Sequence, residues 1–102
     1  MKLVDSTTRF EVREVLYLPA RSWVLFAGSI LEGRVVPGME AFVEVNGTVS
    51  FSFRVDAIEA IDRVAHDQSW LALVVHDADR GEAQIWSSSC PAGTVIELRR
   101  QP

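Results

Sequence analysis

The sequence has one cysteine, Cys90, in 102 residues. A lone thiol cannot form an internal disulfide, which fits a reducing compartment and leaves the hydrophobic core to hold the fold. Long apolar runs are also absent, because Arg21 and Glu32 bracket the longest candidate and no stretch reaches the roughly 18 residues of a membrane helix. Residues 1–5 carry no apolar signal core. These absences predict a soluble, cytoplasmic protein that does not enter a membrane.

Lysine is almost missing, since the ten basic residues are nine arginines and Lys2. The net charge is −4, and the one adjacent basic pair is Arg99-Arg100. Proteins that bind nucleic acids usually carry a clustered basic face. The charge balance therefore disfavours a nucleic-acid partner.

Motifs for nucleotide binding and for catalysis are missing too. No GxxxxGK[ST] phosphate loop occurs, and the run Ser87-Ser88-Ser89 has no GxSxG context. The carboxylates fall on predicted solvent faces and turns, and no pair stands out as an acid–base couple. The sequence predicts no cofactor, no metal ion and no catalytic residue.

The composition that is present describes a globular chain. Apolar residues make up 48% of the sequence and charged residues 24%, which predicts one folded domain over residues 1–102. Residues 1–8 form a polar N-terminal lead. No internal repeat, low-complexity segment or linker divides the rest.

The stretch 12–45 organises the fold, because alternating apolar residues flank three glycines spaced five apart. Gly28 lies in the strand 24–30, where a Cβ would crowd the neighbouring strand. Gly33 and Gly38 are turn positions that need a positive φ. In strand 24–30, Val24 and Phe26 should face inward, and the loss of phase over 14–18 predicts a bulge.

A hairpin follows at Asn46-Gly47, whose residues tolerate the positive φ of a type I′ turn. A strict two-residue turn would set Glu44 opposite Val49 on the core face. We therefore expect a longer loop or a bulge that restores the register.

The pattern in the second half of the chain allows more than one assignment of secondary structure. Residues 57–61 fit a strand or a helical turn, and we favour the strand. Residues 70–75 form a continuous apolar strand, Asp79-Arg80-Gly81 predicts a turn, and 83–88 alternate weakly around Ile85. Residues 94–99 close the barrel, with either Val95 or the pair Ile96 and Leu98 on the buried face.

These features resemble domain 2 of the translational GTPases, the β-barrel that follows the nucleotide domain in elongation factor Tu. Ala20 and Ser22 stand where that family prefers glycine. The matching positions are Pro19 and Arg21 in the first turn, Gly28 and Ile30 in the second strand, Gly33 and Gly38 in the next turn, and Val43 in the strand after it. The resemblance implies a small, closed or nearly closed antiparallel β-barrel of six to eight strands, standing alone without its GTPase.

Two histidines and the cysteine are the candidates for chemistry. His66-Asp67 and His76-Asp77 could supply metal ligands, but a strand between them places the pairs roughly 17–20 Å apart. Cys90 could act as a nucleophile if a histidine activated it. A buried small residue before a proline turn is the plainer interpretation.

The outer surface carries the most informative oddity. Leu31 and Phe42 are apolar where the resembled family is usually polar, and Trp23 and Leu25 could join them on one outer face. Such a patch marks an interface, unless residues 1–8 or 76–90 fold over it. The sequence therefore favours a non-enzymatic binding module for a protein partner or a second copy of itself, through Trp23, Leu25, Leu31 and Phe42.

Two alternatives remain open. The first is a barrel that binds RNA or a tRNA end, since domain 2 contributes to aminoacyl-tRNA binding in elongation factor Tu. The second is a small enzyme that uses His66, His76 or Cys90.

Overall fold

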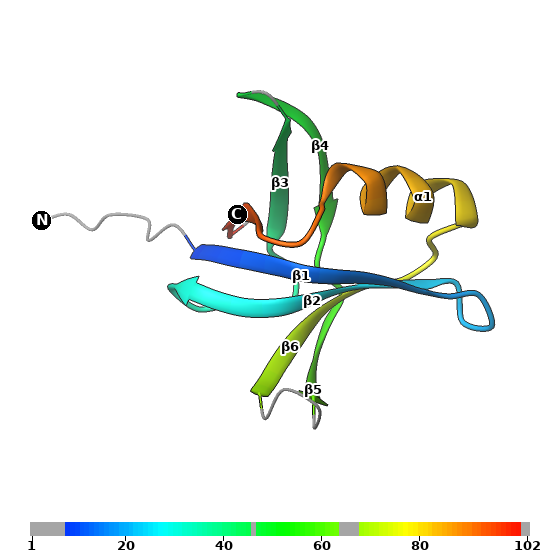
Figure 1. Ribbon diagram of the computed structural model, residues 1–102, viewed down its shortest axis with the longest axis horizontal. Helices are drawn as coiled ribbons and strands as arrows, with labels where there is room; N and C mark the ends of the chain where they lie inside the picture. The colour runs from blue at the N-terminus through cyan, green and yellow to red at the C-terminus, as the bar shows by residue number, and fades with distance from the viewer. Residues whose placement is uncertain (1–7, 46, 64–67, 101–102) are drawn as a thin grey trace, which may run out of the picture.

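The computed structural model describes residues 8–45, 47–63 and 68–100. They form seven strands and one helix, and β5 confirms the strand favoured over a helical turn at 57–61. The elements are β1 Thr8–Leu18, β2 Trp23–Glu32, β3 Glu40–Val45, β4 Thr48–Arg54, β5 Ala57–Arg63, β6 Gln68–Val75, α1 Arg80–Ser89 and β7 Thr94–Arg99 (Figure 1).

The strands join one antiparallel sheet in the order β4-β3-β7-β1-β2-β6-β5. The sheet curls through 190° into a half-barrel. This confirms the predicted all-β, nearly closed barrel. The barrel stays open because β4 and β5, the two edges, do not pair with each other in the described part of the chain.

Thr8 differs from the prediction, because it belongs to the sheet rather than to a polar lead. It is buried, pairs with Leu98 of β7, and donates its hydroxyl hydrogen to the Arg34 carbonyl oxygen at 2.8 Å. Burial of this hydroxyl is affordable because it also accepts from the Arg34 N–H at 3.2 Å. Residues 1–7 of the predicted lead lie outside the described residues.

The chain crosses from one edge of the sheet to the other through Val55 and Asp56. The N–H of Val55 donates to the Met39 carbonyl at 2.9 Å, and its carbonyl accepts from the Gly38 N–H at 2.7 Å. The Asp56 N–H then donates to the Val74 carbonyl at 2.8 Å. β4 and β5 are thus two arms of one bent segment that changes partner from β3 to β6.

Gly28 lies where β1 and β2 approach each other closely. The register of β1 against β2 shifts between Val12 and Glu14, so Arg13 is the bulged residue and the predicted bend is confirmed. A Cβ on Gly28 would overlap the carbonyl oxygen of Glu11 and lie 3.1 Å from the Arg13 nitrogen. The sequence prediction for Gly28 is therefore confirmed.

The predicted turn glycines adopt the left-handed conformation. Gly33, Gly38 and Gly47 have φ values of 85°, 96° and 80°, which an L side chain rarely adopts. Gly47 closes the β3–β4 hairpin, and Asn46 beside it lies outside the described residues.

The β3–β4 hairpin combines a two-residue turn with a bulge. Val45 lies opposite Thr48 at the turn. A register shift between Val43 and Glu44 then sets Val43 opposite Phe51. The predicted bulge that restores the register is confirmed.

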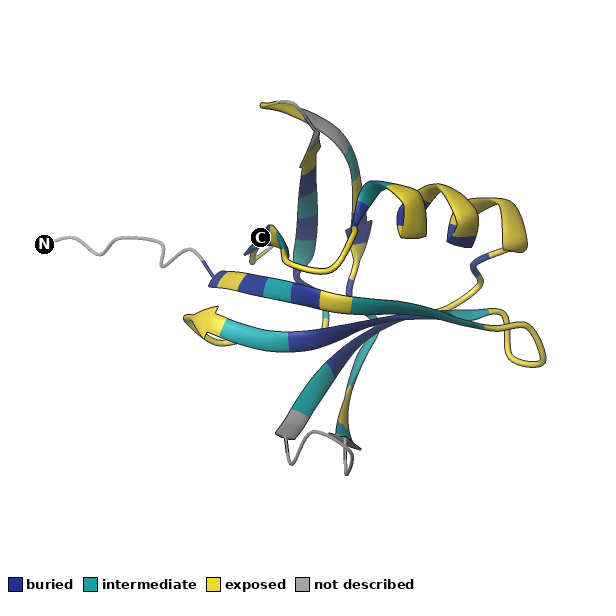
Figure 2. Cartoon of the chain, viewed as in Figure 1, coloured by how far each residue is buried: buried dark blue, intermediate teal, exposed yellow. Residues whose placement is uncertain are grey.

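The core cluster lies on the inner face of the curled sheet. Figure 2 marks its buried residues on the strands and on α1. Val24 and Phe26 face it from β2 as predicted. On β7 the buried pair is Ile96 and Leu98, whereas Val95 is 40% exposed, which decides the face that the sequence left open.

Helix α1 was not predicted, and the weak alternation over 83–88 is not a strand. Asp79 accepts a hydrogen bond from the Glu82 N–H at 2.8 Å, and Glu82 accepts one from the Asp79 N–H at 3.2 Å. This reciprocal capping box starts a helix. Ala83, Trp86 and Cys90 then recur at helical spacing and are all buried, so the helix covers the open side of the half-barrel.

We expect Asp79→Ala to lower the free energy of unfolding by about 1 kcal/mol, because the first turn of α1 loses its side-chain acceptor. Urea denaturation measures the change. Ser88→Ala, on the exposed side of the same helix, should change the free energy by less than about 0.5 kcal/mol. Equal values for the two variants would show that the capping box contributes nothing.

Candidate binding surface

A second apolar cluster lies on the outer face of the sheet, on the side away from the core. Cross-strand pairing places its members together, since Leu25 pairs with Leu16 on β1 and with Val74 on β6. We call it the outer cluster, and it consists of Leu16, Trp23, Leu25, Ala57, Ile61, Ala72 and Val74.

Two further apolar side chains extend this face by register. Leu18 pairs with Trp23 and is 39% exposed, and Trp70 pairs with Ile61 of the outer cluster. Directly paired residues of an antiparallel sheet point to the same face. The outer cluster is therefore bordered by exposed or half-buried apolar groups.

Trp23 lies at one end of the outer cluster and contacts two side chains there, those of Arg21 and His76. The Arg21 guanidinium carbon lies 4.9 Å from the centroid of the Trp23 ring, within the range of a cation–π contact. The His76 ring stacks on Trp23 with centroids 4.8 Å apart and an interplanar angle of 21°. The main-chain N–H of His76 donates to the Asp56 carboxylate at 2.8 Å.

The two segments that carry Trp23 and His76 are joined by a main-chain hydrogen bond. The Ala78 N–H donates to the Ser22 carbonyl at 2.8 Å, which joins the β1–β2 turn to the connection between β6 and α1. Ser22 and Asp77 have φ values of 57° and 55°. Non-glycine residues with such values persist where the surrounding structure holds them, and they concentrate at functional sites. The backbone on either side of the Trp23 and His76 rings is therefore fixed by the fold.

The structure separates the four residues that the sequence grouped. Trp23 and Leu25 share the outer cluster. Leu31 lies six residues beyond Leu25 on β2, about 20 Å along the strand, and is 49% exposed. Phe42 is on β3, three strand spacings or about 14 Å from β2, and its ring lies 5.0 Å from the Arg99 guanidinium.

The prediction of one patch containing all four residues is therefore wrong. Leu25 is also only 9% exposed, so it fills the floor of the outer cluster instead of projecting from it. The strand phase was correct, but the order of strands separates Phe42 from the others.

The connecting segments pack on the inner side of the sheet. Val35, Met39, Ala78 and Cys90 all belong to the core, and Trp86 of α1 packs there against Phe26. Every member of the outer cluster comes from a strand. Within the described ranges, residues 76–90 do not fold over the outer cluster, apart from the stacked His76 ring.

The candidate catalytic groups do not come together. Cys90 is buried at the C-cap of α1, and His76 lies before the N-terminus of that helix. A ten-residue helix is about 15 Å long. His66 and Asp67 lie outside the described residues, and among the described ones no cluster of three or more metal-ligating side chains occurs.

Cys90 should make stability depend on pH in the alkaline range. Burial raises the pKa of its thiol from 9.0 to about 11. The folded protein then keeps a proton that the unfolded chain loses, so the free energy of unfolding should be level below pH 9 and should fall as the pH rises from 9 to about 11. Urea denaturation across this range measures it. Cys90→Ala should lack this fall, and identical profiles would contradict the assignment.

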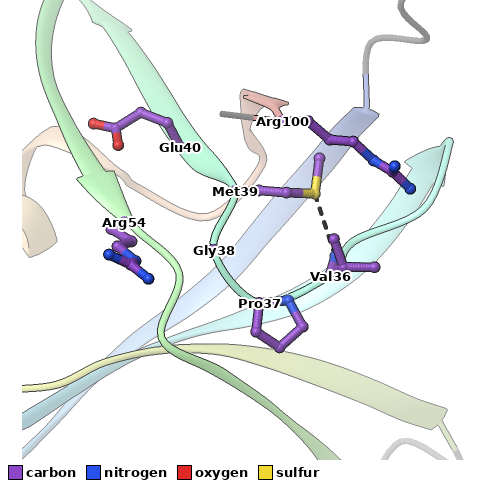
Figure 3. A pocket seen from close by; sticks show the side chains of 7 residues that line it. All are labelled: Val36, Pro37, Gly38, Met39, Glu40, Arg54 and Arg100. Atoms are coloured by element: carbon purple, nitrogen blue, oxygen red, sulfur yellow. Dashed lines mark hydrogen bonds between the residues drawn. The ribbon is translucent and has the colours of Figure 1, made fainter. Parts of the chain in front are cut away.

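A pocket of about 560 Å³ opens beside the β2–β3 connection (Figure 3). Its apolar side is formed by the loop before β3, and the Val36 N–H donates to the Met39 sulfur at 3.2 Å. Two cationic side chains flank it from β4 and from the end of β7. The lining residues are Val36, Pro37, Gly38, Met39, Glu40, Arg54 and Arg100.

The fold and this surface define a small all-β half-barrel with apolar side chains on both faces of one sheet. The chain matches no protein-family model, no curated protein and no solved structure. In the described ranges no helix has the length and apolarity needed to cross a membrane.

Sequence reasoning missed most of the outer cluster. Leu16 lies opposite Leu25 only because of the bulge in β1. Ile61 lies near Ala72 only because β5 pairs with β6. The available signal was the run Leu16-Tyr17-Leu18, which places apolar side chains on both faces of the first strand.

Proposed function

We propose that this chain is a non-enzymatic binding module, a soluble and cytoplasmic barrel of the translation-factor domain 2 kind, that holds another protein chain on its outer cluster. One observation carries the proposal: a single sheet bears apolar clusters on both faces, and α1 covers the inner one only. The outer cluster has a buried floor, and its half-buried members keep part of their apolar surface open to solvent. Apolar surface that stays open to solvent in one patch is a common interaction site.

The composition of the surface supports a protein partner. Tryptophan and arginine dominate the binding energy of protein interfaces, and Arg21, Trp23 and Trp70 lie on or beside the outer cluster. The rim is formed by the polar groups of His76 and Asp56. A fixed aromatic anchor with a polar rim is the usual anatomy of such a site.

The test compares two identical substitutions at isoleucines. Ile61→Lys places a charge in the outer cluster, whereas Ile85→Lys places it on α1, where Ile85 is already 61% exposed. In extracts of cells that produce the protein, wild type and Ile85→Lys should elute in a complex larger than twice the 11.4 kDa mass of the chain, and Ile61→Lys should elute without the additional partner. Thermal unfolding confirms that both variants are folded. A wild type that elutes as a free chain or as a dimer of itself, or an Ile61→Lys complex of unchanged size, would contradict the proposal.

A second candidate, RNA binding, is favoured by the pocket between Arg54 and Arg100. Two guanidinium groups beside an apolar wall could hold a phosphate and a base. This function predicts an affinity for single-stranded RNA that falls steeply with salt and is lost in Arg54→Ala/Arg100→Ala. RNA binding that is insensitive to salt and unchanged in the double variant would contradict this function.

A further inference from the structure

In the described part of the chain, strand β4 is one edge of the sheet, and its main-chain groups on the side away from β3 have no neighbouring strand. Val55 directs both its N–H and its carbonyl toward the β3 side, to Met39 and Gly38. Main-chain groups alternate in direction along an antiparallel strand, so those of Ser52 and Arg54 point away from β3. β4 is the end of the sheet in the described residues, so these groups lie on the open side of β4, the side that has no neighbouring strand.

The two edges of the sheet differ in how they are protected. Edge strands usually avoid pairing with other chains through charged residues, proline or a very short length. β5, with the sequence AIEAIDR, has three charged residues, whereas β4, with the sequence TVSFSFR, has a single one at its end. Neither strand contains proline. β4 is therefore the edge that the sequence leaves available.

The position of Ser52 suits an axis of symmetry. Ser52 is exposed, small and uncharged, and its N–H and carbonyl face the open side together. Two copies related by a two-fold axis can exchange both hydrogen bonds between their Ser52 residues, since residue i of one chain meets residue i of the other. A strand edge with such a centre is complementary to itself.

Charges at the two ends of β4 favour the antiparallel arrangement. Arg54 ends β4 and is 73% exposed, and Glu44 is exposed near the β3–β4 turn at the other end. Antiparallel pairing centred on Ser52 brings each Arg54 toward the turn of the other copy, with Glu44 two strand spacings or about 10 Å away at the backbone. Parallel pairing would instead bring the two arginines together.

Pairing also covers apolar surface. Phe51 is half-buried, and its ring stacks on Trp86 with centroids 6.0 Å apart. In the antiparallel arrangement, Phe51 lies opposite Phe53 of the second copy, on the face that contains the core. Aromatic residues paired across strands stabilise a sheet further.

We propose that β4 pairs antiparallel with β4 of a second copy of this chain, around Ser52, and so joins two half-barrels into one continuous sheet. The β4 edge is separate from the outer cluster, so the test of this dimer is independent of the test of the proposed partner site. The partner is identified as a second copy because the main-chain groups, the small central residue and the charged ends are all self-complementary.

The experiment measures solution mass by light scattering on purified protein over a range of concentrations. Wild type should reach twice the 11.4 kDa mass of the chain. Ser52→Lys and Ser52→Glu should each be monomeric, because they place like charges directly opposite each other. Ser52→Thr, the matched control, should remain dimeric, and Glu59→Lys on the exposed face of β5 should have no effect.

A mixture of Ser52→Lys and Ser52→Glu gives the decisive result. Opposite charges then face each other at the axis, so the mixture should regain the dimeric mass that each variant lost. Recovery by mixing also shows that both variants are folded. A monomeric wild type would overturn the proposal, as would a dimer that persists in both charged variants or a mixture that stays monomeric.

Discussion

Gly28→Ala is expected to lower the free energy of unfolding by about 3 kcal/mol or more. The added Cβ would overlap the Glu11 carbonyl oxygen and would lie 3.0 Å from the Glu11 carbonyl carbon. Both atoms belong to the backbone at the bulge of β1, which cannot move without breaking the β1–β2 ladder. Urea denaturation of the two proteins measures the difference.

Gly81→Ala is the matched control for this prediction. The Cβ at Gly81 would lie 3.3 Å from Oδ1 of Asp79, the side-chain atom that accepts from the Glu82 N–H. A shift of this atom costs at most the cap, about 1 kcal/mol. Alanine also has a higher helix propensity than glycine, by about 1 kcal/mol. The change should therefore stay within about 1 kcal/mol, and a Gly28→Ala protein of similar stability would show that β1 and β2 are not in close contact there.

Trp86→Ala is also expected to have a large effect, a loss of about 3–5 kcal/mol in the free energy of unfolding. The Trp86 ring is 8% exposed and lies 5.8 Å from the Phe26 ring and 5.7 Å from the Phe53 ring, between centroids. Its removal leaves a cavity between α1 and the sheet. Denaturation by urea gives the magnitude, and near-ultraviolet circular dichroism reports the loss of aromatic packing.

Ile85→Ala tests whether that loss comes from the buried face of α1. Ile85 neighbours Trp86 in the helix but is 61% exposed, so its truncation should cost less than about 0.5 kcal/mol. Similar losses in the two variants would mean that α1 does not cover the open side of the half-barrel.

Local patterns were sufficient to predict the parts of the fold that depend on local geometry. Alternation in β2 predicted that Phe26 faces the core, and the glycine in that strand predicted the close approach at Gly28. The loss of phase over 14–18 predicted a bulge in the first strand, because a strand that changes face must insert a residue. These features need only the period of a strand and the size of a side chain.

Helix α1 was not predicted because the sequence signal for its start is confined to the four residues 79–82. The span 83–88 alternates weakly, but the capping pair Asp79 and Glu82 begins a helix that the burial of Trp86 then stabilises. Tertiary packing overrides weak alternation in a segment of this length.

The candidate surface was predicted only in part because strand order is not a local property. The phase of β2 places Trp23 and Leu25 on the outer face, as predicted. β7, the last strand in the sequence, inserts between β3 and β1 and thereby separates Phe42 from them. Leu16 and Ile61 joined the surface through pairings that no short pattern in the sequence encodes.

Site-specific photo-cross-linking is the most direct measurement of the central claim, that the outer cluster holds another protein. A benzophenone amino acid replaces Trp23 in one variant and Ile85 in a second, and both are irradiated in the cells that produce the protein. The account predicts a discrete protein adduct from position 23 and none from position 85. Equal labelling at both positions, or an adduct with RNA alone, would contradict it.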